Sequence, residues 1–205
     1  MDIYAWIYIS IIFLGIALTI AFILYKSVLQ SRIQKQYLNK EEKANYVEQL
    51  NKFKSEYNIV DEDSVYDIAK KVGLVIEECD RKKMESGYDG RIENEKIKIT
   101  KDLSIRKKNV IIAHEIAHFL RKDTSNSVAG CKTKTLFVRK KDEQICDYIA
   151  SIILLPENEL KERMINSHYN NMVKSSRSQF VAQIAEEKNI SMSVVIKRIQ
   201  EFDNI

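Results

Sequence analysis

The chain is poor in proline, glycine and cysteine. One proline and five glycines in 205 residues argue against a turn-rich β-sandwich and favour helices. The three cysteines, Cys79, Cys131 and Cys146, are odd in number and form no C-x-x-C pair. This argues against a secreted disulfide framework and fits a reducing compartment. The formal net charge of only +4 does not indicate a nucleic-acid-binding protein.

Charge is absent from one long stretch near the start of the chain. Residues 3–25 form an uncharged apolar run, which as a helix would span roughly 35 Å, enough to cross the hydrocarbon core of a bilayer. The run has neither the basic start nor the cleavage site of a signal peptide. Lysine and arginine follow it and none precedes it, so the positive-inside rule places the later residues in the cytoplasm. We therefore expect a single-pass membrane protein with its N-terminus outside, anchored in the lipid bilayer by residues 1–26.

Beyond this run, the apolar spacing predicts an α+β fold. Residues 27–56 predict a juxtamembrane helical linker, and Asp63 or Ser64 should cap a helix that ends at Gly73. The apolar run Leu74-Val75-Ile76 predicts a strand, and the alternation of polar and apolar residues predicts another at 96–100, with a turn at Asp89-Gly90. Helical spacing follows over 104–121, 142–155, 157–168, 176–188 and 191–202. We expect a transmembrane helix, then a mostly helical domain over 57–205 that contains a small antiparallel sheet and ends in C-terminal helices from residue 157.

The residues that point to chemistry are His114-Glu115-Ile116-Ala117-His118. The chain has only three histidines, and a spacing of four places His114 and His118 on one helix face, where both can bind one Zn²⁺. Glu115 lies on the adjoining face and is suited to accept a proton from water rather than to bind the ion. The pattern predicts a catalytic zinc site.

A catalytic zinc site needs a third protein ligand. The metzincin pattern would require glycine at position 121 and histidine at position 124, which are Arg121 and Thr124 here. A carboxylate from the predicted helix 142–155 is the alternative. Glu143 can supply the ligand oxygen, and Asp147, one turn later, can accept the free N–H of a ligating histidine. Cys131 and Asp147 remain rival third ligands.

The third histidine, His168, lies beside Tyr169 in a polar segment. A histidine in such a segment is most often a surface residue. The alternative is that His168 or Tyr169 stabilises the oxyanion of a transition state.

These stretches resemble the ImmA/IrrE family of zinc metallo-endopeptidases. Residues 113–120 resemble the active-site helix of that family, and residues 143–156 resemble its second signature, in which a glutamate ligand opens a helix ending in Leu-Leu-Met-Pro. Residues 86–99 and 180–199 resemble its small sheet and its C-terminal helix pair. The resemblance covers about residues 57–205 and implies a zincin-like fold, Zn²⁺ as cofactor and a protein substrate, commonly a helix-turn-helix repressor.

The sequence leaves three functions open. The leading one is proteolysis of a cytoplasmic transcriptional regulator or repressor by a membrane-anchored zinc metallo-endopeptidase. The second is a zinc-binding scaffold or sensor without turnover, against which the presence of Glu115 argues. The third is a DNA-binding regulator that uses the helix pair 182–199, whose second helix offers only Lys197 and Arg198 as cations. Nucleic acid is therefore not an expected partner.

A protein substrate needs a place to dock. The alternation of Lys96-Ile97-Lys98-Ile99-Thr100 suits an edge strand, beside which an extended substrate can add as a further strand. The alternative is a central strand that is paired on both sides.

Overall fold

The computed structural model describes residues 19–20, 22, 38–84, 88–121, 130–132 and 141–202. The chain divides into two units, Met1–Lys40 and Glu41–Ile205. In the first unit, the described part comprises Thr19, Ile20, Phe22 and residues 38–40.

The location predicted from the sequence needs a correction. Within the described residues, no helix has both the length and the apolar character that a membrane crossing requires. This finding overturns the predicted single-pass location with the catalytic domain in the cytoplasm. The apolar run 3–25 itself lies outside the described residues except at Thr19, Ile20 and Phe22.

The second unit contains a four-stranded sheet in the order β1-β3-β2-β4. The strands are β1 (Val75–Cys79), β2 (Tyr88–Glu93), β3 (Lys96–Thr100) and β4 (Gly130–Lys132). Strand β3 runs parallel to β1 and antiparallel to β2, and β2 runs antiparallel to β4. The α+β class is confirmed, but the sheet is mixed rather than antiparallel. Because β3 is paired on both sides, the predicted docking of a substrate beside Lys96–Thr100 is wrong.

The glycine of the predicted Asp89-Gly90 turn has a different role. Both residues lie inside β2, and the hairpin turn is formed instead by Asn94 and Glu95, with φ values of 49° and 61°. Positive φ at both positions is the signature of a two-residue type I′ turn. A Cβ atom on Gly90 would lie 2.1 Å from Cγ2 of Ile111. Glycine is therefore required here for the close approach of a strand to a helix.

Seven helices of the described residues accompany the sheet, with two short 3-10 turns. They are α2 (Lys40–Glu56), α3 (Val65–Lys71), α4 (Ile105–Leu120), α5 (Lys141–Leu154), α6 (Glu157–Asn166), α7 (Lys174–Glu187), α8 (Met192–Phe202), η1 (Arg81–Lys83) and η2 (Tyr169–Asn171). The helices predicted at 104–121, 142–155, 157–168, 176–188 and 191–202 are confirmed to within a few residues at their ends. In the predicted helical linker 27–56, the described helix begins only at Lys40. Helix α3 begins with a capping box between Ser64 and Asp67, and Gly73 follows it with φ of 80°, as its sequence predicted.

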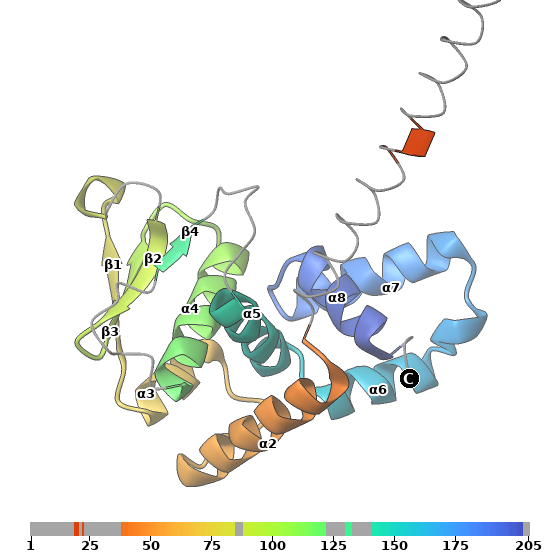
Figure 1. Cartoon of the computed structure of the whole chain (residues 1–205), viewed down its shortest axis with the longest axis horizontal. Helices are drawn as coiled ribbons and strands as arrows, with labels where there is room; N and C mark the ends of the chain where they lie inside the picture. The colour runs from red at the N-terminus through yellow and green to blue at the C-terminus, as the bar shows by residue number, and fades with distance from the viewer. Residues whose placement is uncertain are drawn as a thin grey trace, which may run out of the picture. The chain divides into compact units, whose positions relative to one another are not determined.

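Helix α4 lies between the sheet and helix α5 (Figure 1). Ile111, Ile112 and Ile116 on this helix are 3% exposed or less. Burying an isoleucine side chain contributes roughly 1.5–3 kcal/mol, so these residues fix α4 firmly against its neighbours. Strand β3 contributes Ile97 and Ile99, both fully buried, which explains its alternating sequence.

Helix α2 packs within the second unit, although the sequence predicted a linker over residues 27–56. Leu50 and Phe53 are buried, and the Phe53 ring lies 6.4 Å from the ring of Phe119 on α4. The Nζ atom of Lys43 lies 5.5 Å from the ring centroid of Tyr148 on α5. The domain boundary at residue 57 stays a prediction, but α2 contacts both helices that carry the candidate site.

Candidate metal centre

Helix α4 holds the His-Glu-x-x-His motif in the interior. His114, Glu115 and His118 are 1%, 0% and 4% exposed, which is rare for ionisable side chains unless they are paired or bind a metal. Ile111 lies against Gly90 of β2, and His114 contacts Glu143 and Asp147 of α5.

Two histidines and a glutamate converge between α4 and α5. Nε2 of His114 lies 3.1 Å from Nε2 of His118 and 3.2 Å from Oε2 of Glu143. Nε2 of His118 lies 3.6 Å from Oε1 of Glu143. Atoms that each lie about 2.0–2.1 Å from a tetrahedral ion are roughly 3.3 Å apart. The three side chains, whose potential ligand atoms all lie within 4.8 Å of one another, therefore fit a single metal ion.

Asp147 supports the cluster from behind. Its Oδ1 atom lies 2.9 Å from Nδ1 of His114, on the side of the ring away from the cluster. This is the contact by which a carboxylate fixes the tautomer of a ligating histidine and leaves Nε2 for the ion. The contact is the one that the predicted supporting role of Asp147 requires, and the assignment of that role stays a prediction. The side chain of Cys131, a rival third ligand, lies outside the described part of the structure.

The electrostatics of the cluster favour a cation. Burial alone would lower the pKa of His114, but hydrogen bonds with Asp147 and Glu143 and the charges of Glu115 and Asp147 raise this pKa from 6.5 to about 9. The pKa of Glu143 is lowered, chiefly because its carboxylate accepts a hydrogen bond from His114. The carboxylates thus hold a positive charge between them, and a bound metal ion would take the place of the proton.

The sequence reasoning missed the surroundings of His118. Nδ1 of His118 lies 3.4 Å from Sγ of Cys146, and Nη1 of Arg121 lies 3.8 Å from the same sulfur. The only hint in the sequence was that Cys146 precedes Asp147. Neighbouring helix positions point about 100° apart, so that each can reach a different histidine.

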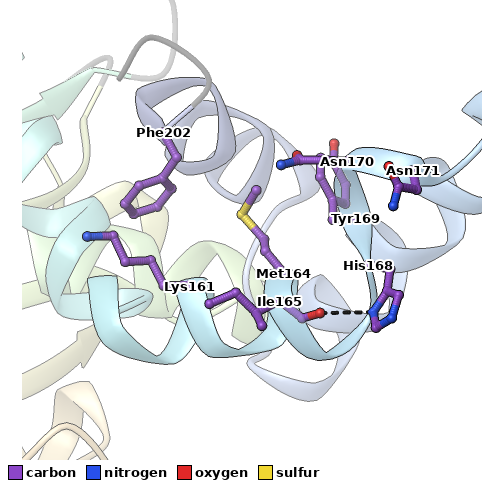
Figure 2. A pocket seen from close by; sticks show the side chains of 8 residues that line it. All are labelled: Lys161, Met164, Ile165, His168, Tyr169, Asn170, Asn171 and Phe202. Atoms are coloured by element: carbon purple, nitrogen blue, oxygen red, sulfur yellow. Dashed lines mark hydrogen bonds between the residues drawn. The ribbon is translucent and has the colours of Figure 1, made fainter.

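His168 and Tyr169 line a different part of the molecule. They contribute to a pocket of about 510 Å³ between α6, η2 and the end of α8, together with Met164, Ile165 and Phe202 (Figure 2). Nδ1 of His168 is hydrogen-bonded to the carbonyl oxygen of Ile165 at 3.1 Å. None of the residues that line this pocket belongs to the metal cluster. The geometry therefore gives no support to an oxyanion role for His168 or Tyr169.

Comparison with known families agrees with this site. Residues 69–200 match the model of the IrrE N-terminal-like domain, a peptidase family. No curated protein matches the chain. The matched segment contains the sheet and both helices of the metal cluster, and it covers well over half of the sequence. The chain belongs to the IrrE N-terminal-like family of peptidases, as its resemblance to ImmA/IrrE proteins predicted.

Proposed function

We propose that this protein is a zinc metallo-endopeptidase that cleaves a protein substrate at the cluster of His114, His118 and Glu143. The observation that carries the proposal is the convergence of two imidazole nitrogens and one carboxylate beside a buried glutamate, in a chain of a peptidase family. Two nitrogens and one oxygen are the ligand set of many catalytic zinc sites, in which a fourth position stays open. By the family resemblance, the substrate class is a transcriptional regulator such as a helix-turn-helix repressor.

The ligands and the base have separate roles in this mechanism. His114, His118 and Glu143 would hold the ion, and Asp147 keeps His114 in the tautomer whose Nε2 faces it. When bound, zinc supplies Lewis-acid chemistry that polarises a peptide carbonyl and acidifies water. The Glu115 carboxylate accepts a proton as the water oxygen bonds to the carbonyl carbon. It then delivers the proton to the amide nitrogen as the C–N bond breaks.

A DNA-binding function is weakened by the packing of α8. One of the two cations in this helix, Arg198, is 2% exposed, and its Nε donates to the carbonyl oxygen of Leu155. Its guanidinium is therefore taken up inside the protein and is not presented to phosphates.

The test compares the full chain with Glu115→Gln, His114→Ala and the exposed control Glu62→Gln. Metal content is measured by mass spectrometry, and cleavage by comparing protein fragments in cells that produce each variant. We expect about one Zn²⁺ per chain in the wild type, in Glu115→Gln and in the control, and none in His114→Ala. Glu115→Gln should lose cleavage because it removes the base and keeps the shape. A Glu115→Gln variant with full cleavage would contradict the mechanism.

A further inference from the structure

One histidine of the cluster has an unusual neighbour. A ligating histidine commonly donates its second N–H to a carboxylate or a carbonyl oxygen, and His114 follows this rule through Asp147. The second nitrogen of His118, Nδ1, instead faces the sulfur of Cys146 at 3.4 Å. Both residues are buried, with exposed fractions of 4% and 0%. If Nε2 of His118 binds the ion, Nδ1 carries the hydrogen, and the sulfur is placed to accept it.

The same sulfur lies within reach of a second donor. Nη1 of Arg121 lies 3.8 Å from Sγ of Cys146 and 3.3 Å from the carbonyl oxygen of Asp142. Nη2 lies 3.1 Å from Oδ1 of Asp142. The Asp142 side chain is mostly exposed, so the ion pair alone contributes little to stability. The ion pair instead fixes the relative position of two segments. Asp142 directly precedes the ligand Glu143, and Arg121 directly follows the turn of α4 that carries His118.

We propose that Cys146, held by Arg121, is a positioning residue that fixes the His118 ring for metal binding. This inference rests on the proposed function, because it assigns His118 as a ligand. The sulfur selects the tautomer with hydrogen on Nδ1 and so leaves the lone pair of Nε2 directed at the cluster. Arg121 restrains the sulfur and joins the end of α4 to the first turn of α5. These contacts thereby fix the positions of two ligands from different helices, His118 and Glu143, relative to each other.

The variants to compare are Cys146→Ala, Cys146→Ser and Arg121→Gln in the full chain. Alanine removes the acceptor, whereas the serine hydroxyl keeps one. The matched control is Cys79→Ala, because Cys79 is also a buried free cysteine, at 9% exposure, but lies on β1 outside this network. Thermal unfolding of each metal-free variant checks that the fold is retained.

The first measurement is Zn²⁺ affinity by competition with a chromophoric chelator. Loss of an outer partner of a ligand typically costs about 10–100-fold in affinity, and sulfur is a weak acceptor, so we expect a loss of about 3–10-fold for Cys146→Ala. Cys146→Ser should recover most of this loss, Arg121→Gln should lose about 2–3-fold, and Cys79→Ala should match the wild type.

The second measurement is the ¹⁵N spectrum of the histidine rings in the metal-free protein. The Cys146→Ala change should shift the Nδ1 signal of His118, and Cys146→Ser should restore it, which a purely structural role would not predict. If Zn²⁺ affinity and the His118 signals are unchanged in both Cys146→Ala and Arg121→Gln, the inference is wrong. A wild-type protein that binds no Zn²⁺ would instead contradict the proposed function.

Discussion

The contact between Gly90 and Ile111 allows a quantitative test of how α4, the helix that carries His114 and His118, is positioned. In Gly90→Ala, the new Cβ would lie 2.1 Å from Cγ2 of Ile111 and 3.5 Å from the carbonyl oxygen of Lys98. Ile111 is 3% exposed, and a β-branched side chain in a helix has one strongly preferred χ1 rotamer. The clash therefore has to be relieved by moving α4 away from β2. Such overpacking typically costs about 1–3 kcal/mol of folding free energy.

A second substitution isolates this contact. Ile111→Leu removes the Cγ2 branch at nearly constant volume and should cost less than about 1.5 kcal/mol alone. Combined with Gly90→Ala, Ile111→Leu should relieve the clash. The loss of unfolding free energy in the double variant should therefore be smaller than the sum of the two single losses by about 1–2 kcal/mol. Urea unfolding in the presence of a chelator measures all four proteins without the contribution of bound metal. Strict additivity, or a Gly90→Ala protein as stable as the wild type, would refute the reasoning.

Three further predictions follow from the described contacts. Phe53→Ala should lower stability by about 3–5 kcal/mol because α2 packs into the core, whereas the exposed Val60→Ala should change it by less than about 0.5 kcal/mol; equal thermal unfolding of the two would mean that α2 is a solvated spacer. Glu143→Ala should abolish Zn²⁺ binding in equilibrium dialysis, whereas Asp147→Ala should weaken it by about 10–100-fold, and the reverse order would identify the wrong ligand. In the chelator-treated protein, the pKa of His114 is raised from 6.5 to about 9, so its protonation stabilises the folded state. This stabilisation is fully present below pH 6.5 and is lost as the pH rises towards about 9. Urea unfolding should accordingly show a decrease of the order of 2–3 kcal/mol over that range, and a flat profile would contradict it.

The helices and the pairs of side chains that meet in the candidate cluster could be predicted from the sequence because their signals are local. His114 and His118 stand one helical turn apart, and Glu143 and Asp147 repeat that spacing on the next helix. Spacing within one helix decides which side chains share a face. The spacing is therefore sufficient to predict that the two members of each pair lie close together, whatever the packing of the two helices.

The arrangement of the strands could not be predicted in the same way. The alternation in Lys96–Thr100 shows that one face is buried, and Ile97 and Ile99 are indeed fully buried. It carries no information on which strands lie beside it, so a central strand was mistaken for an edge. The turn predicted at Asp89-Gly90 was wrong for a related reason. Glycine occurs both in turns and where two backbones pack closely, and only the position of Ile111 in the fold distinguishes the two cases.

The contact of Cys146 with His118 was equally beyond the sequence. It depends on how α5 is rotated about its axis relative to α4, which is a property of the packing of the two helices. A buried cysteine in an apolar stretch is most often a packing residue, and its sequence neighbours did not distinguish the two roles.

The metal cluster and its supporting side chains come from two short stretches, residues 114–121 of α4 and its cap and residues 142–147 of α5. Among the side chains that the structure describes, none from β1, β2 or β3 and none from a helix after α5 belongs to the cluster. A designed helical bundle that reproduced the packing and register of these two helices would need only these stretches to recreate the centre, provided that the supporting contacts were kept. The two stretches could in this way be transferred to another protein. Comparing the metal affinity of bundles with and without Cys146 and Asp147 would show how much of the affinity depends on these supporting side chains and how much on the rest of the original fold.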